Sequence, residues 1–121
     1  MFIKKFLNLK NSYFIGKKAE YKCQKYLKSM GFKIIKTNFK TTLGEIDIIA
    51  TKENLIVAFE VKFRSDSNYL AYSISKIQQR RVSNAFLLFL QYKTCYNTYH
   101  KRFDALLVNK DFEIQHLTNT W

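Results

Sequence analysis

The chain has 121 residues, of which 47% are hydrophobic and 17% aromatic, so it is long enough and apolar enough to fold as one domain. This composition excludes an intrinsically disordered chain. The formal net charge of +12 is typical of a protein that binds a polyanion, most often nucleic acid and less often an anionic membrane surface, although a lysine-rich proteome would also raise it.

Other classes of protein are excluded by what the sequence lacks. The two cysteines, Cys23 and Cys95, are too few for a disulfide framework or a thiolate metal site, so both are expected to be reduced core residues. The longest apolar run, residues 85–90, is far shorter than the about 20 residues of a membrane helix. A Gly-rich phosphate loop and a Walker-type lysine are both missing. We therefore expect a cytoplasmic protein with no membrane association and no nucleotide cofactor.

The first predicted helix follows a basic segment. Residues 1–11 contain three lysines and are interpreted as a basic N-terminal arm, either loose or a short added helix, ahead of a single domain over residues 12–121. Ser12 is a suitable N-cap, and Gly31 ends the helical pattern. Between them the apolar residues recur at helical spacing: Ile15, Ala19, Cys23, Tyr26, Leu27 and Met30.

Lysines dominate this part of the chain. The first forty residues hold eleven lysines, including Lys17 and Lys18, and a single acid, Glu20. Glu20 lies beside the apolar stripe of the helix. It either pairs with Lys17 one turn earlier or belongs to a functional site, and the residues alone leave both open.

A strand and a hairpin follow the first helix. Residues 32–39 are predicted to be a strand, with Asn38 beginning a turn over residues 38–42. Residues 44–64 contain two apolar, β-branched runs on either side of the polar residues 51–54, which predicts two strands joined by a tight turn.

The register of this hairpin brings acids together. If the turn is centred between Glu53 and Asn54, Asp47 faces Glu60 and Glu45 faces Lys62, with opposed Cβ atoms about 4.5–5.5 Å apart. Alternation then predicts one apolar face (Ile46, Ile48, Ala50, Val57, Phe59, Val61 and Phe63) and one charged face (Glu60, Lys62 and Arg64). A solvated polar face is the simple interpretation. However, Asp is a poor strand former, and opposed acids need a proton or a cation between them, which favours a metal site.

The second half of the chain predicts a helix and two more strands. The helix begins at Ser73 or Ser75, and Lys76, Arg80 and Arg81 near its start face either a phosphate or solvent. Its predicted buried stripe is Ile74, Ile77, Ala85, Leu88, Phe89 and Tyr92. Residues 102–108 and 112–117 are the strands, and His100 and His116 are interpreted as surface or loop residues. An aromatic and basic group either stacks on bases or forms the exposed end of the helix: Tyr92, Lys93, Tyr96, Tyr99, Lys101 and Arg102.

Asp47, a short spacer and the run Glu60-Val61-Lys62 resemble the core motif of the PD-(D/E)XK nucleases. This restriction-endonuclease-like superfamily includes the archaeal Holliday-junction resolvases. A narrower resemblance covers nearly everything after residue 15. The successive blocks GKKAEYKCQKYLKSMGFKIIKTNFKTTLGEIDIIA, FEVKFR, KIQQRR and RFDALLV are similar to those of the YraN-like uncharacterised bacterial family, and Asn38 matches a family position. The loop after Arg64 departs from the family pattern because it lacks Gly and Pro.

The resemblance implies an α/β fold with a restriction-endonuclease-like mixed central sheet flanked by helices, an αβββαβ core with the 44–64 hairpin at its middle. It implies metal-dependent hydrolysis of a DNA phosphodiester, on branched or otherwise structured DNA. Asp47, Glu60 and Glu20 would hold Mg²⁺ or Mn²⁺, and Lys62 would complete the catalytic set. The expected nucleic-acid contacts are Lys17, Lys18, Arg64, Lys76 and Arg80.

Two other functions and the assembly state stay open. One is a nucleic-acid-binding module that keeps the nuclease fold without catalysis. The other is a structural or interaction protein in which the opposed acids are incidental. A homodimer is compatible with the sequence.

Overall fold

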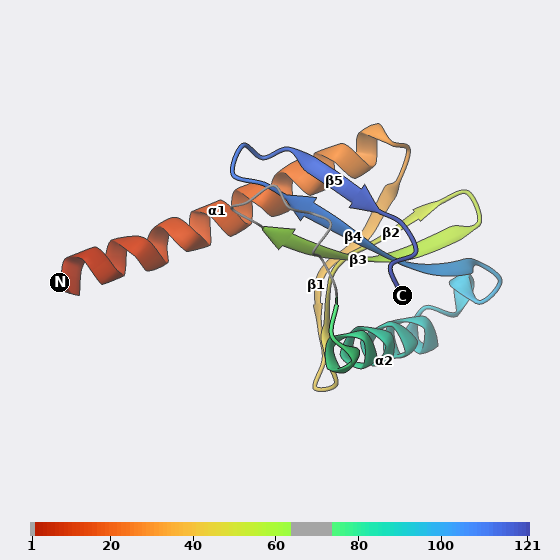
Figure 1. Cartoon of the computed structure of the whole chain (residues 1–121). Coiled ribbons are helices and arrows are strands. Elements are labelled where there is room, and N and C mark those ends of the chain that lie inside the picture. Colours follow the sequence, from red (N-terminus) through yellow and green to blue (C-terminus); the bar gives the residue numbers. More distant parts are fainter. Residues whose placement is uncertain (1, 64–73) are drawn as a thin grey trace.

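The computed structural model describes the backbone of residues 2–63 and 74–121 and the side chains of residues 12–63 and 74–121. Over these residues the chain forms a five-stranded mixed sheet with one long helix on either face (Figure 1). The predicted α/β class and the sheet flanked by helices are confirmed.

The elements follow one another as helix, three strands, helix and two strands. They are α1 (Phe2–Ser29), β1 (Lys33–Lys40), β2 (Glu45–Lys52), β3 (Leu55–Phe63), α2 (Lys76–Tyr92), the 3₁₀ turn η2 (Thr94–Tyr96), β4 (His100–Val108) and β5 (Ile114–Leu117). The strand order is β1-β2-β3-β4-β5. Only β3 and β4 are parallel among these neighbours, and α2 lies in the crossover between them.

The predicted hairpin forms with the predicted register. Ile48 pairs with Phe59, and the pairing continues to Lys52 and Leu55. Glu53 takes a left-handed φ of 55° in the tight turn. The pairing does not continue beyond Ile48 and Phe59 toward Asp47 and Glu60. The two strands therefore part where the acids begin.

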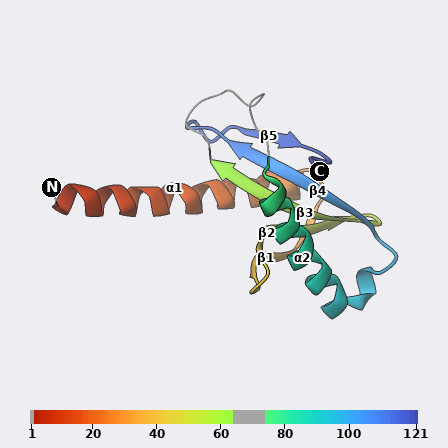
Figure 2. The same ribbon diagram turned by 60° about the horizontal axis from the view of Figure 1, so that its bottom comes forward.

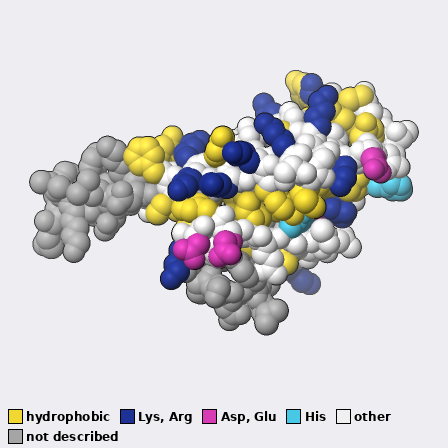
Figure 3. Space-filling view, turned by 90° about the horizontal axis from the view of Figure 1, so that it is seen from above, with side chains coloured by type: hydrophobic (Ala, Val, Ile, Leu, Met, Phe, Trp, Pro, Cys, Tyr) yellow, Lys and Arg dark blue, Asp and Glu magenta, His cyan; other side chains and the backbone are white. Residues whose placement is uncertain are grey.

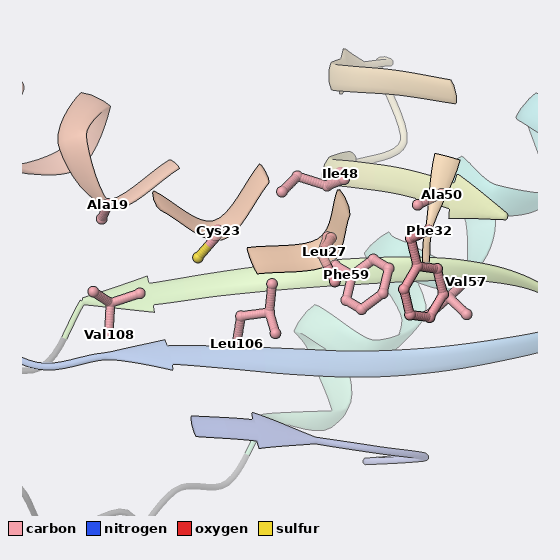
Figure 4. Packing of buried hydrophobic residues seen from close by; sticks show 10 residues of the cluster. All are labelled: Ala19, Cys23, Leu27, Phe32, Ile48, Ala50, Val57, Phe59, Leu106 and Val108. Carbon is pink, nitrogen blue, oxygen red and sulfur yellow. The ribbon is translucent and has the colours of Figure 1, made fainter. Parts of the chain in front are cut away.

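The face toward α1 carries the first core. Ala19, Cys23 and Leu27 of α1 are buried against Phe59, Leu106 and Val108 of the sheet (Figure 4). This confirms the centre of the predicted apolar stripe. Its ends were wrong, since Ile15 is 37% and Met30 47% exposed. Ile15 lies one turn before the first of these buried residues, Ala19, and Met30 lies beyond the end of α1 at Ser29.

The opposite face carries a second core, so the prediction of a charged outer face for the hairpin was wrong. Ile49, Ile56 and Ala58 pack against α2, which covers this face. Ile46 also belongs to this cluster and not to the α1 side. The reason lies in the β1–β2 turn, which packs beside α2 (Figures 1 and 2) and turns the start of β2 toward that helix.

The start of α1 differs from the prediction. Ser12 is not the N-cap, because the helix begins at Phe2 and runs through Ser12 without a break. Between Phe2 and Ser12 the sequence contains no Gly or Pro that would interrupt a helix. Residues 2–11 thus extend α1 beyond the sheet (Figure 1).

Asn38 lies inside β1 and not in a turn, which corrects a second prediction. The turn is formed by residues 41–44, where the Thr41 hydroxyl accepts hydrogen bonds from the Leu43 and Gly44 amides at 3.1 and 3.0 Å. Asn38 nevertheless has a left-handed φ of 52°.

Helix α2 begins after Ser75, one of the two predicted starts. Ser75 is its N-cap, and its hydroxyl accepts a hydrogen bond from the Gln78 amide at 3.1 Å. Ser73, Arg64 and the loop after it lie outside the described residues. The buried residues of the helix are Val82, Ala85, Phe86 and Phe89. Ile77 and Tyr92, predicted to be buried, are 71% and 89% exposed, because the buried stripe of α2 runs only from Val82 to Phe89.

The last strands form as predicted, but His116 is not a surface or loop residue. It lies on β5, where its Nε2 is 2.7 Å from Oδ2 of the fully buried Asp104 and its Nδ1 is 2.9 Å from the Tyr26 hydroxyl. Arg102 donates two hydrogen bonds to Asp104, at 2.8 and 2.7 Å, and the Asn119 amide donates a third at 2.9 Å. This Asp104 network joins α1, β4, β5 and the C-terminal residues.

Two smaller predictions concern residues in and around η2. Cys95 is exposed, so the expectation that both cysteines are core residues holds for Cys23 alone. Tyr96 and Tyr99 pack at the edge of the α2-side core, with the ring of Tyr96 stacked on Phe89. No helix in the described part of the chain is long and apolar enough to span a membrane.

Candidate functional site

A polar cavity lies where β2 and β3 part. It has a volume of about 260 Å³ and is bounded by the start of β2, the end of β3 and the first turns of α2. Its polar lining residues are Glu45, Asp47, Glu60, Lys62, Gln78 and Arg81. We call it the acidic cavity, because three of these six side chains are carboxylates.

Asp47 is held in place by the backbone of the neighbouring strand. Its Oδ2 accepts a hydrogen bond of 2.8 Å from the Val61 amide. The carboxylate thus satisfies an amide of β3 at the point where the strand pairing has ended. A substitution that removed this acceptor would leave the Val61 amide without its partner.

The surroundings of Asp47 favour its neutral form. Burial is the main cause, and the charges of Glu60, Glu20 and Glu45 add to it, so that the pKa of Asp47 rises to about 6 despite the hydrogen bond from Val61. A group in this state gains from a proton or a cation placed beside it. The electrostatic argument made from the hairpin register therefore applies to the observed site.

Glu60 is buried and has two charged or polar partners on the cavity wall. Its Oε1 lies 3.2 Å from Nζ of Lys62 and accepts a hydrogen bond from the side-chain amide of Gln78. Lys62 forms an ion pair with Glu60 and is not paired with Glu45, because the pairing of β2 with β3 ends at Ile48 and Phe59. On its other side, Glu45 is paired with Lys40 of β1. Gln78 of α2 therefore fixes the glutamate, and the glutamate fixes the lysine.

Glu20 stands beside the acidic cavity and not in its lining. It lies on α1, with Oε2 3.9 Å from Nζ of Lys17, so the predicted ion pair is present. Its charge still raises the pKa of Asp47. Among residues 2–63 and 74–121, no three His, Cys, Asp or Glu side chains are placed to hold a metal ion. The structure brings Asp47, Glu60 and Lys62 together, with Glu20 at one side.

The residues present fit a divalent cation in part. Mg²⁺ and Mn²⁺ prefer carboxylate oxygens and keep several waters, so two protein carboxylates can suffice. Asp47 and Glu60 line the same cavity, and burial, together with the charges of Glu60, Glu20 and Glu45, raises the pKa of Asp47 there.

The chain matches the model of the Uncharacterised protein family UPF0102 over residues 19–108. The chain belongs to this family. This confirms the narrower resemblance drawn from the sequence blocks.

Curated members of the family come from several bacteria. A UPF0102 protein of Nitrobacter winogradskyi is 37% identical over 93 residues, which cover 77% of this chain and 79% of that protein. One from Marinomonas sp. is 34% identical over an aligned region that covers 85% of this chain and 82% of that protein. One from Francisella tularensis is 36% identical, with 79% and 85% covered.

A solved structure shares the fold. Hjc of Archaeoglobus fulgidus, a Holliday junction resolvase from an archaeal hyperthermophile, superposes with a TM-score of 0.53 at 17% sequence identity. The match covers 82% of this chain and 72% of Hjc. The restriction-endonuclease-like fold of this member of UPF0102 is thereby confirmed.

Two residues of the acidic cavity come from α2, Gln78 and Arg81. The sequence left Arg81 facing either a phosphate or solvent and gave no role to Gln78. Both lie in the family-matched region, within the block KIQQRR. Gln78 follows the N-cap Ser75 by three residues, a position where Gln usually serves the cap itself. That ordinary role hides the contact with Glu60, which exists only because α2 packs over β3.

The predicted nucleic-acid contacts in the described part of the chain are divided between α1 and α2. Lys17 is at the side of α1 that bears Glu20, whereas Nζ of Lys18 lies 4.3 Å from the ring centre of Phe112. Lys76 and Arg80 are exposed on the first turns of α2, and Arg64 lies outside the described residues. Seen from above, Lys and Arg side chains gather along α1, and few acids appear on this face (Figure 3).

Proposed function

We propose that this protein is a metal-dependent endonuclease that hydrolyses phosphodiester bonds in DNA, with branched or otherwise structured DNA as its substrate. The observation that supports it most is the acidic cavity, where Asp47, Glu60 and Lys62 meet and the pKa of Asp47 is raised to about 6. The fold similarity to a resolvase is consistent with it. Fold alone would not carry the proposal, because one fold hosts many functions.

Asp47 and Glu60 would hold Mg²⁺ or Mn²⁺, with Glu20 completing the set from α1. Such an ion would lower the pKa of a bound water and offset charge on the phosphate oxygens. Glu20 is close enough to act on the charge of Asp47 but is paired with Lys17. DNA that draws Lys17 toward a phosphate would release Glu20 toward the cavity.

The cations of the cavity act on the substrate. Lys62, at 3.2 Å from Glu60, presents an ammonium group to a phosphate oxygen and stabilises the charge that grows there in the transition state. Gln78 keeps Glu60, and through it Lys62, in position. Arg81 supplies a second cation on the α2 wall, suited to two oxygens of one phosphate.

Basic side chains would hold DNA around the cavity. Lys76 and Arg80 stand on the first turns of α2, next to Gln78 and Arg81. Lys17 and Lys18 stand on α1, and Arg64 follows the end of β3 in the sequence. These side chains contact phosphates, which position the substrate without selecting a base sequence.

A nuclease assay on branched, nicked and single-stranded DNA with Mg²⁺ or Mn²⁺ tests the proposal. The wild type should cleave at least one of these, and Lys62→Ala should cut about 10²-fold more slowly at nearly unchanged DNA affinity. Lys110→Ala removes an equal charge in the exposed turn before β5 and serves as the control. Equal rates for Lys62→Ala and the wild type, or no cleavage with either metal, would overturn the proposal.

A non-catalytic nucleic-acid-binding module is the second candidate. It is favoured by the lack of a three-ligand metal group among the described residues and by the partners that already engage Glu60. Tight, salt-dependent DNA binding without cleavage of any substrate in that assay would select it.

A further inference from the structure

We propose that a second hollow, between α1 and β1, binds the stretch of a single nucleic-acid strand that flanks the phosphate in the acidic cavity. The choice of ligand rests on the proposed function. This α1–β1 hollow is open, has a volume of about 440 Å³ and is lined on its α1 side by Tyr13, Gly16, Lys17 and Glu20 and on its β1 side by Asn38 and Lys40. Nothing in the catalytic argument uses Tyr13, Asn38 or Lys40.

The hollow and the acidic cavity are neighbours. Lys40, in the hollow, lies directly opposite Glu45, in the cavity, in the β1–β2 pairing. Glu20 lines the hollow, and its charge acts on Asp47 in the cavity. The end of β1 and the start of β2 therefore border both spaces, which places the hollow next to the phosphate position proposed for the cavity.

The chemistry of the lining suits a nucleic-acid strand. Lys17 comes from the helix side and Lys40 from the strand side, which places a cation at each wall for the phosphates. Tyr13 is 62% exposed, and Nζ of Lys17 lies 5.7 Å from its ring centre. An exposed ring beside cations is the arrangement on which unpaired bases stack. The charge of Glu20 is offset by Lys17.

The backbone of Asn38 supports a ligand site. Its neighbours Thr37 and Phe39 pair with Ile48 and Ile46, yet Asn38 itself has a left-handed φ of 52° in the middle of a strand. Such a conformation is uncommon for residues other than Gly, although Asn adopts it more readily than most, and residues in sparsely populated backbone conformations cluster at functional sites. The exposed Asn38 amide, which both donates and accepts hydrogen bonds, lies at the hollow.

Gly16 keeps the helix side of the hollow open. A methyl group placed on Gly16 would meet no atom within 4 Å, so the helix backbone is accessible there. A bulky residue at this position would fill the space between Lys17 and Tyr13. Together these features distinguish the hollow from an ordinary solvated surface of a basic helix.

Pentathymidylate, titrated into the full chain in EDTA and followed by amide NMR, tests the inference without any need for catalysis. We expect the largest shifts at Gly16, Asn38 and Lys40. Lys40→Ala should weaken binding and reduce the log–log salt slope by about 0.7, the value for one phosphate contact with a single strand. Asn38→Gly should also weaken binding, while Gly keeps the left-handed backbone without strain.

Lys22→Ala is the control, because Lys22 is an exposed lysine of α1 that lies outside the hollow. Equal weakening by Lys22→Ala and Lys40→Ala, or shifts confined to other surfaces, would overturn the inference. The nuclease proposal fails separately. Binding in the hollow without cleavage of any DNA keeps the subsite, whereas cleavage of DNA with unchanged KM in Lys40→Ala and Asn38→Gly removes it.

Discussion

Asp47 and Asp104 are both carboxylates of the protein interior, and their environments act in opposite directions. Asp47 has one amide donor and three acidic neighbours, and its pKa is raised. Burial would also raise the pKa of Asp104, but hydrogen bonds from His116, Arg102 and the Asn119 amide outweigh it and hold the pKa below its usual value. The ionised form of Asp47 would therefore be stabilised by a bound cation, whereas the ionised form of Asp104 is already stabilised by its hydrogen-bond donors.

Asp47→Asn should stabilise the metal-free protein at neutral pH. The raised pKa means that ionised Asp47 destabilises the native state, a cost that grows as the pH rises from about 4 to about 6 and is complete above that. Thermal unfolding in EDTA should therefore give a higher Tm for the variant at pH 8 and no difference near pH 4. The Asn side chain can still accept the hydrogen bond from Val61.

Added Mg²⁺ should reverse this order. It should raise the Tm of the wild type, since an ion that binds only the native state stabilises it, and leave Asp47→Asn nearly unchanged. A variant that responds to Mg²⁺ as the wild type does would remove Asp47 from the ligand set.

Asp104→Asn should destabilise the protein. Losing the carboxylate leaves Arg102 and His116 without a buried partner, at a cost of about 3 kcal/mol near pH 7. Because the folded pKa is lowered, the stability from ionised Asp104 is present above about pH 4 and is lost as the pH falls through the folded pKa. Urea unfolding at pH 7 and pH 3 should show the difference shrinking in acid. Asp111→Asn, in the exposed turn before β5, should show no such trend.

At the residue scale, the sequence predicted the proximities that depend on local pairing. That Asp47 and Glu60 line one space follows from the register of one hairpin, which a tight turn fixes, although the strand pairing itself ends at Ile48 and Phe59. The place of Gln78 does not follow from it, because its contact with Glu60 depends on how a helix from another part of the chain packs on the sheet. The same holds for His116, whose partners come from α1 and β4.

Among the elements, the contact between the β1–β2 turn and α2 decides the shape of the acidic cavity. A methyl group on Gly44 would lie 2.2 Å from the carbonyl oxygen of Arg81, so the turn and the helix backbone touch at this point. Only Gly permits that approach. The contact sets the distance between β2, which carries Asp47, and α2, which carries Gln78.

Gly44→Ala should therefore destabilise the protein strongly, by about 3 kcal/mol or more, because backbone must move away from backbone. Chemical denaturation measures the loss. Gly16→Ala is a suitable control, since it adds the same methyl group inside a helix with open space around it and should stabilise by up to about 1 kcal/mol. A Gly44→Ala variant with the same free energy of unfolding as the wild type would show that the turn is not in tight contact with α2.

The predicted elements were correct where the pattern itself was local. Strands β2, β3, β4 and β5 and the Ser75 cap follow from β-branched runs, turns and capping. The predicted apolar face of the hairpin was correct except for Ile46. The prediction that the other face is charged and uncovered was wrong, because alternation cannot tell whether a strand is covered on one face or on both. The predicted start of α1 was wrong because Ser12, a residue type that often caps helices, was interpreted as the N-cap, although the helix continues on both sides of it.

For the whole molecule, charge is divided between an acidic cavity and basic surroundings. The chain has a formal charge of +12, yet Glu45, Asp47 and Glu60 meet in one space. If the proposed function is correct, a DNA phosphate would be drawn to the molecule by the long-range positive field and repelled from the cavity until a cation is bound there. Binding and catalysis should therefore respond differently to ions.

The affinity for duplex DNA should fall steeply with salt, by a log–log slope of about −0.9 for each phosphate neutralised. Replacing both Lys17 and Lys18 with Ala should make the slope about 1.8 less steep if each contacts one phosphate. Fluorescence anisotropy over a range of KCl concentrations measures this. A slope near zero in the wild type would speak against nucleic acid as the partner.

The parallel pairing of β3 with β4 has a consequence for the order of folding. The hairpin of β2 and β3 closes over a tight turn, whereas the first β3–β4 pair joins Leu55 to His100, far along the chain. Because closing a long loop costs more entropy, the hairpin can form first, with Asp47 and Glu60 side by side in water, and α2 then closes over them. The repulsion between the acids therefore becomes strong only late in folding, when α2 buries them. A divalent cation that binds at that step would slow unfolding more than it speeds folding.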